Sequence, residues 1–271
     1  MCPPKFLDLL HTPGFVEQAV DRAGGGLEID AQRSQPAAQP FTFAHVVDLT
    51  HTLSPASPVF PSLPAFVVEE PFASHEAHGV SINRYTLSDH CGTHFDAPYH
   101  VSRHGLHTDE VPVRSLVAPA VVVDIGEKAK RDHAALVTPA DLLAWERRYG
   151  RIPVGAAVLM ASGWAARIGS APAYVNTDAS GVHHFPGFSV EAARFLLDER
   201  EVVGIGVDTL SLDHGPAQNF AVHTAFLPTN RWGLECLANL ENIPPSGAMI
   251  FVGVPKIAGS SGGPTRVMAV W

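Results

Sequence analysis

Five short runs of apolar residues, mostly β-branched, recur along the chain, and each is bounded by Gly, Pro or Asp. They lie at residues 120–125, 156–160, 202–207, 248–254 and 266–270. Runs of this length and composition are typical of buried β-strands, because a helix of the same burial would be longer. The chain is therefore predicted to build a sizeable sheet.

Two helices are predicted between these strands. Thr138 is an N-cap residue followed by a proline and, in the first turn, by Asp141, which predicts a helix to about Tyr149. A second helix begins in the same way and covers residues 189–200. Many strands and few helices indicate an α/β or α+β protein in which the sheet dominates.

The sequence outside these elements indicates that the chain has two parts, an N-terminal arm and a single domain. Residues 5–22 have apolar positions at helical spacing, and three glycines and a polar tract to Pro40 follow them. This predicts an N-terminal arm over residues 1–42, partly helical or disordered. Residues 43–271 are expected to form one domain, since 271 residues do not force a further division.

Composition excludes several classes of protein. The net charge is −9, with 18 Lys and Arg against 27 Asp and Glu, which disfavours a nucleic-acid partner. No apolar run approaches the roughly 20 residues needed to cross a bilayer. The three cysteines, Cys2, Cys91 and Cys236, are too few for a disulfide framework. We therefore expect a soluble, reduced, cytoplasmic protein.

Residues 90–100 read HCGTHFDAPYH and gather the side chains that bind divalent metals. His90 and His94 are four residues apart, as in a helical metal motif, yet Gly92 and Pro98 favour an extended or turning loop after a strand at residues 80–87. In an extended chain His94 and Asp96 point to the same side. The stretch is therefore predicted to converge on one ion.

Two imidazoles and one carboxylate are a common ligand set of catalytic rather than structural metals, because a coordination position stays open. Water at such a position has its pKa lowered from its value in bulk water to roughly 7 and becomes a nucleophile. His100 is then a candidate general base or acid. Cys91 offers a rival thiolate mechanism, but no helix N-terminus is predicted near it to lower its pKa, so we interpret it as a small buried spacer.

HCGTHFDAPYH resembles the HxGTHxDxPxH signature of the metal-dependent hydrolases grouped as the putative cyclase family, which includes bacterial kynurenine formamidase and isatin hydrolase. The similarity continues in PVFP at 58–61, SGW at 162–164, DTLSLD at 208–213 and GSSGGPTRV at 259–267. It covers roughly residues 43 to 271 and leaves the arm outside. It implies a single α/β domain of swivelling β/β/α architecture, with a few helices packed on the dominant sheet.

The resemblance also implies the site. The metal ligands would be His90, His94, Asp96, His223 and Glu235, and His100 would be catalytic. The last two ligands are twelve residues apart, the interval seen in kynurenine formamidases. Zinc and manganese both fit, as one or two ions per subunit. From the residues alone, other partners stay open, namely His183, His184, Asp208, Asp213 and His214.

The expected activity is hydrolysis of an amide C–N bond of a small aromatic substrate by metal-activated water, as in arylformamidases. Four aromatic residues are candidates for stacking on the substrate, each with an ordinary core role as the alternative: Phe60, Trp164, Phe185 and Trp232. GSSGGP lacks the Lys of a phosphate loop and predicts a tight turn, from which Ser260 or Ser261 would reach substrate.

Three alternatives accompany this expectation. The first is hydrolysis of a cyclic amide or lactone, as in isatin hydrolase, because Phe60 stands where kynurenine formamidases typically have tryptophan. Ring closure, suggested by the family's name, is weaker. The third is a non-catalytic metal-binding protein, which would need neither His100 nor an open ligand position. The resemblance further implies a homodimer or homotetramer.

Overall fold

A nine-stranded mixed sheet organises the part of the chain that the computed structural model describes, residues 42–271. From edge to edge its strands are β1 (Val46–Asp48), β13 (Arg266–Val270), β11 (Met249–Gly253), β5 (Val117–Asp124), β7 (Ala157–Ala161), β9 (Gly204–Val207), β10 (Trp232–Glu235), β4 (His94–Asp96) and β12 (Gly262–Pro264). The four strands from β5 to β10 are parallel, and the remaining pairs are antiparallel. The five strands predicted from apolar runs are confirmed as β5, β7, β9, β11 and β13.

Two small two-stranded sheets accompany it, β2 (Val67–Val68) with β3 (Tyr85–Thr86) and β6 (Leu136–Val137) with β8 (Gly187–Phe188). The helices are α3 (His75–His78), α4 (Gly126–Arg131), α5 (Pro139–Tyr149), α6 (Ala171–Val175), α7 (Val190–Arg200) and α8 (Ala221–Phe226). Short 3-10 turns lie at Pro98–His100, Val113–Leu116, Trp164–Arg167, Leu227–Thr229 and Leu240–Asn242. The predicted arm over residues 1–42 lies, apart from its last residue, outside the described residues.

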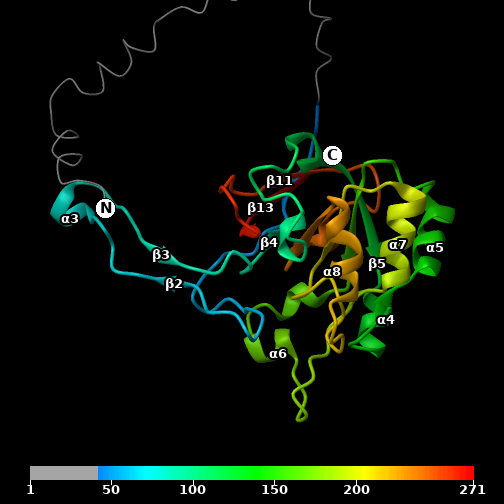
Figure 1. Ribbon diagram of the computed structural model, residues 1–271, viewed down its shortest axis with the longest axis horizontal. Coiled ribbons are helices and arrows are strands. Elements are labelled where there is room, and N and C mark those ends of the chain that lie inside the picture. Colours follow the sequence, from blue (N-terminus) through cyan, green and yellow to red (C-terminus); the bar gives the residue numbers. More distant parts are fainter. Residues whose placement is uncertain (1–41) are drawn as a thin grey trace, which may run out of the picture. The chain divides into compact units, whose positions relative to one another are not determined.

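The two predicted helices begin at the predicted caps. The Asp141 side chain accepts the backbone N–H of Thr138 at 2.8 Å, and the Ser189 hydroxyl accepts the N–H of Ala192 at 3.1 Å. Each bond satisfies a backbone donor that a helix end would leave unpaired. Figure 1 shows α5 and α7 side by side next to the sheet.

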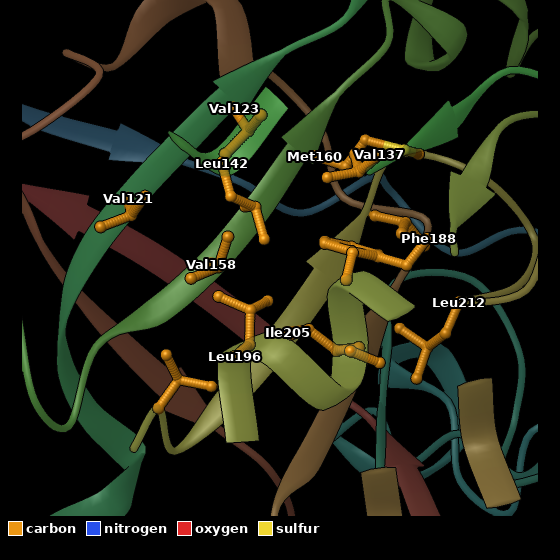
Figure 2. Packing of buried hydrophobic residues seen from close by; sticks show 14 of the residues in the cluster. Val121, Val123, Val137, Leu142, Val158, Met160, Phe188, Leu196, Ile205 and Leu212 are labelled. Atoms are coloured by element: carbon orange, nitrogen blue, oxygen red, sulfur yellow. The ribbon is translucent and has the colours of Figure 1, made fainter. Parts of the chain in front are cut away.

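Alternate residues of the central strands enter two cores. Val121 and Val123 of β5 pack toward α5 and α7, with Leu142 and Leu196 facing them from those helices (Figure 2). Their neighbour Val122 points to the opposite face, into a second core formed with β10, β11 and β13. Burial on both faces explains why these strands read as continuous apolar runs rather than alternating ones.

The sheet departs from the predictions at two of its strands. His94–Asp96 is strand β4 rather than a loop, and Gly262–Pro264 is strand β12 rather than a tight turn. The two strands pair with each other, and β4 also pairs with β10. Glycine and proline disfavour strands locally, but hydrogen bonds to partners more than a hundred residues away override that preference. Of the strand predicted at residues 80–87, only Tyr85–Thr86 is a strand in the structure, namely β3.

The described helices are all short, and none combines the length and apolar character required to cross a membrane.

Candidate metal centre

The site is assembled where β4, β10 and α8 meet. His94 and Asp96 are two residues apart on β4 and therefore project from the same face of the strand. Glu235 lies directly opposite His94 in the β4–β10 ladder. His223 is the third residue of α8. Gly233 opposes Asp96, and a Cβ at that glycine would lie 3.0 Å from Asp96 Oδ2, so the absence of a side chain leaves room for the carboxylate.

These four side chains converge tightly. His94 Nε2 lies 3.4 Å from Asp96 Oδ1 and 3.3 Å from Glu235 Oε2. His223 Nε2 lies 3.1 Å from Glu235 Oε1 and 3.7 Å from Asp96 Oδ2. All four residues are buried, and Asp96 is only 1% exposed. Residues from positions 94 to 235 thus present four ligand-type groups to one point.

Hydrogen bonds set which nitrogen each imidazole presents. His94 Nδ1 lies 2.9 Å from the carbonyl oxygen of Gly92, and His223 Nδ1 lies 2.6 Å from Asp213 Oδ2. Both partners are acceptors, so each Nδ1 carries the hydrogen and each Nε2 is left for a metal. Asp213 also accepts the backbone N–H of Val222 at 2.8 Å. Asp213, which the sequence left as a possible ligand, therefore orients the ligand His223 instead.

A second group of potential ligands shares Asp96. His90 Nδ1 lies 2.8 Å from Asp96 Oδ1, and the ring centroids of His90 and His100 are 3.9 Å apart. His90, Asp96 and His100 place one ligand atom each close enough to hold an ion, as do His94, Asp96 and Glu235. Asp96 is therefore common to both groups of potential ligands.

Charge within the cluster also calls for a cation. Asp96 Oδ2 is buried without a hydrogen-bond partner, and the ion pairs of Asp96 and Glu235 in the described residues involve only histidines. Burial opposes ionisation of Asp96, yet the neighbouring imidazoles of His223, His90 and His94 hold its pKa well below the usual range. Burial likewise opposes protonation of His94, but Asp96 and Glu235 raise its pKa well above 6.5. The extra proton on His94 supplies the positive charge that a divalent ion would otherwise supply beside the two carboxylates. Imidazole and carboxylate ligands of this kind fit Zn²⁺ or Mn²⁺.

His100 differs from the other imidazoles because it is exposed. Although the ring reaches solvent, its partial desolvation lowers the pKa of His100 below 6.5, and the neighbouring His90 and His223 lower it further against the attraction of Asp96. A neutral imidazole at neutral pH is ready to accept a proton.

An apolar cavity of about 160 Å³ opens onto these groups. Its lining includes His90, His94, His100, His223 and Glu235, and its walls come from Pro58, Val59, Phe60, Leu63, Leu210 and Phe220. No Lys or Arg stands among the described residues that line it. The cavity therefore suits a compact apolar group beside a metal.

Of the four aromatic residues expected to stack on substrate, only Phe60 lines this cavity. Trp164 and Phe185 belong to a buried cluster behind the wall, and Trp232 packs on Phe95 in the core of the sheet at a centroid distance of 5.8 Å. These three residues therefore occupy the core positions that were the alternative to stacking on substrate. Their size made them candidates, but large aromatic side chains fill cores as readily as pockets.

Phe220 also lines the cavity and was not predicted from the sequence; its ring lies 6.1 Å from that of Phe60 and 5.6 Å from that of His223. Phe220 precedes His223 by three residues. That spacing places two residues on one side of a helical turn and was the available signal.

The other candidate groups have different partners. The thiol of Cys91 is buried, which raises its pKa and argues against a thiolate. His184 pairs with Asp178 at 2.8 Å on the surface. Asp208 accepts backbone N–H groups of Ser162 and Trp164, both at 3.0 Å.

Sheet topology and the buried His, Asp and Glu cluster together define an α/β protein built to hold a divalent cation beside an apolar cavity. Residues 47–214 match the sequence model of a family described as putative cyclase. The chain belongs to this family, as the HxGTHxDxPxH motif predicted.

Similar proteins with known names agree with membership of this family. The chain is 32% identical over 241 residues to isatin hydrolase of Roseibium aggregatum, covering 83% of this chain and 91% of that protein. It is 29% identical over 225 residues to kynurenine formamidase of Salinibacter ruber, covering 82% and 96%. The solved structure of isatin hydrolase A from Ralstonia solanacearum superposes with a TM-score of 0.79 at 39% identity, covering 83% and 91% of the two chains. The predicted sheet-dominated α/β fold and the predicted hydrolase class are confirmed.

Proposed function

We propose that this chain is a metal-dependent hydrolase that cleaves an amide C–N bond of a small aromatic substrate. One observation carries the proposal: Asp96 Oδ2, buried and without a hydrogen bond, faces a group of imidazoles and Glu235 at the floor of an apolar cavity. A buried carboxylate oxygen without a partner is costly unless a cation occupies the site.

The ligands in this proposal are those expected from the sequence, His90, His94, Asp96, His223 and Glu235, binding one or two ions of zinc or manganese. When bound, the metal supplies the Lewis acidity that lowers the pKa of water and polarises a carbonyl oxygen. The protein fixes the orientation of the His94 and His223 imidazoles through Gly92 and Asp213. It also buries these ligands almost completely.

His100 is the catalytic residue. It stands at the cavity beside His90 without a side-chain hydrogen bond of its own among the described residues, and its lowered pKa keeps it neutral. In this role His100 accepts the proton of the attacking water and delivers it to the leaving nitrogen. The same group thus serves as base and then as acid.

A cyclic amide or lactone is the second candidate, and the cavity lining favours it over an open-chain amide that carries an amino-acid group. A substrate such as N-formylkynurenine has a carboxylate, which no Lys or Arg of the described lining would pair. A neutral bicyclic amide such as isatin needs only apolar walls, which Phe60, Leu210 and Phe220 provide. Isatin hydrolases among the relatives point the same way.

A homodimer or homotetramer also belongs to the proposal. The two-stranded sheet of β2 and β3 pairs with no further strand in the described residues, and it exposes Val68 at 49% and Tyr85 at 51%. A lone two-stranded ribbon is marginally stable, and a second copy would bury its apolar face. Small-molecule substrate rather than nucleic acid, and a cytoplasmic location, stay predictions of the sequence.

A substrate panel tests the proposed reaction. The protein loaded with Zn²⁺ or Mn²⁺ is assayed on isatin, a lactone, formanilide and N-formylkynurenine. We expect turnover of at least one neutral aromatic substrate, with isatin-type rings preferred over N-formylkynurenine. A protein that holds metal yet hydrolyses none of the four would be a metal-binding scaffold instead.

A further inference from the structure

We propose that Asp89 and Ser261 are positioning residues that turn His90 so that it binds the metal through Nδ1, whereas His94 and His223 bind through Nε2. This inference rests on the proposed metal site and adds to it two residues and a choice of nitrogen. It concerns the one ligand histidine whose Nδ1, rather than Nε2, faces Asp96.

A hydrogen-bond chain fixes the direction of each proton. Ser261 Oγ lies 2.6 Å from Asp89 Oδ2 and 3.1 Å from His90 Nε2. A carboxylate at neutral pH only accepts, so the single hydroxyl proton of Ser261 goes to Asp89. The serine oxygen can then serve His90 only as an acceptor. His90 Nε2 must therefore be the nitrogen that carries hydrogen.

The consequence appears on the other side of the ring. If Nε2 carries the single hydrogen of the ring, Nδ1 has none, yet Nδ1 lies 2.8 Å from Asp96 Oδ1, which is also an acceptor. Two lone pairs at this distance repel unless a metal ion or a second ring proton lies between them. His90 Nδ1 and Asp96 Oδ1 are thus oriented to share a cation, through the opposite ring nitrogen from that used by His94 and His223.

The fold places Ser261 where this chain needs it. β12 pairs with β4, and the backbone N–H of Ala97 donates to the carbonyl of Ser261 at 2.9 Å. The next residue, Gly262, leaves space for the ring, because a Cβ there would lie 2.7 Å from His90 Cε1. A segment 171 residues from His90 in sequence therefore holds the ring in place.

Nuclear magnetic resonance of the full chain, labelled at histidine and loaded with ¹¹³Cd²⁺ alone, tests the choice of nitrogen. A metal on Nε2 is three bonds from both ring protons, whereas a metal on Nδ1 is three bonds only from Hε1. We expect ¹¹³Cd coupling to Hε1 and Hδ2 of His94 and His223, but to Hε1 alone in His90. Coupling to His90 Hδ2, or none to His90 while the other two couple, would overturn the inference.

Variants test the role of the hydroxyl. In S261A, Zn²⁺ affinity should fall roughly 10- to 100-fold, the usual effect of removing a group that orients a ligand. S261T restores a hydroxyl and should recover most of the affinity. S260A is the matched control, because the Ser260 hydroxyl donates to the carbonyl of Gly262 at 2.7 Å, lies 3.5 Å from Asp89 Oδ2 and does not contact His90. It should keep the wild-type affinity and the wild-type coupling pattern.

The outcomes separate the two proposals. A chain that binds neither Cd²⁺ nor Zn²⁺ refutes the metal centre itself. A chain that binds both ions, with wild-type affinity in S261A, keeps the metal centre and refutes the role of Ser261. An equal loss of affinity in S260A and S261A would also refute it, since a general disturbance of the β12 turn would then explain both.

Discussion

At the scale of single residues, His100 is the one imidazole of the site that is exposed and lacks a side-chain hydrogen bond in the described chain. The variant H100A should lose roughly 10²- to 10⁴-fold in kcat, because a positioned acid or base contributes about that much. Metal content should stay at the wild-type value, as measured by elemental analysis. Wild-type turnover in H100A would assign the proton transfer to another group.

Asp213 acts on a ligand rather than on substrate. The variant D213N should weaken Zn²⁺ binding roughly 10- to 100-fold, because the carboxylate 2.6 Å from His223 Nδ1 fixes that imidazole. D178N is a matched control, since Asp178 pairs with His184 at the surface. Calorimetric titration of both variants checks the expectation. If D213N and D178N bound Zn²⁺ with equal affinity, His223 would need no hydrogen-bond partner at Nδ1.

Much of this site could be predicted, because its first half lies in one stretch. His90, His94, Asp96 and His100 lie within one stretch of eleven residues, so their metal-binding and acid–base chemistry could be inferred without knowing the fold. His223 and Glu235 came only from family resemblance, since nothing local marks them as neighbours of Asp96. Asp89 was not predicted, and Ser261 was expected to reach substrate rather than His90, because the role proposed for both residues depends on β12 pairing with β4.

At the scale of elements, α5 and α7 are joined by an ion pair. Arg200 donates to Glu146 through Nε at 2.6 Å and through Nη2 at 2.8 Å, and Arg200 is 7% exposed. The variant R200A should lower the free energy of unfolding by about 2 kcal/mol, as expected for hydrogen bonds between charged groups. Urea unfolding measures it, with R194A, at an exposed arginine of the same helix, as the control. An effect in R194A equal to that in R200A would contradict this expectation.

The same pair has a pH dependence of known sign. The hydrogen bonds from Arg200 hold the pKa of Glu146 below 4.5, so its folded-state pKa is lower than its unfolded one. The stabilisation is then present above pH 4.5 and is lost as the pH falls through the folded pKa. The difference in stability between wild type and R200A should narrow only in that acid range.

The β2–β3 ribbon carries the prediction about assembly. V68D places a charge on its exposed apolar face and should shift a wild-type dimer toward monomers in sedimentation experiments. V113D is the control, because Val113 is a 77% exposed valine on a 3-10 turn. A V68D chain as dimeric as V113D, or a monomeric wild type, would remove the ribbon from the interface.

Elements differed in how well their own sequence specified them. Helices α5 and α7 have caps at Thr138 and Ser189, and five strands are apolar throughout, so local composition and burial agree. β4 and β12 contain or adjoin glycine and proline, and only their mutual pairing makes them strands. Local signals therefore predicted the middle of the sheet and failed at the edge that carries the site.

At the scale of the whole molecule, the metal centre joins segments that are far apart in sequence. β4, β10 and α8 meet only in the folded chain, so a bound ion stabilises the native state over the unfolded one. At about 100 times the Kd this amounts to about 2.7 kcal/mol. Adding Zn²⁺ to chelator-treated protein should raise Tm by roughly 5 to 10 °C. An unchanged Tm would argue against a site that links these elements.

Hydrolysis by this chain is proposed to require an ion held by Asp96 and its neighbours. The most direct test of this requirement is a reconstitution of the metal-free chain, in which bound metal per subunit and the rate of isatin hydrolysis are measured on the same samples. We expect no turnover without metal, and a rate that rises with metal occupancy to a plateau at one or two ions per subunit. Full activity in the metal-free chain, or full occupancy without hydrolysis of isatin or any related amide, would contradict this proposal.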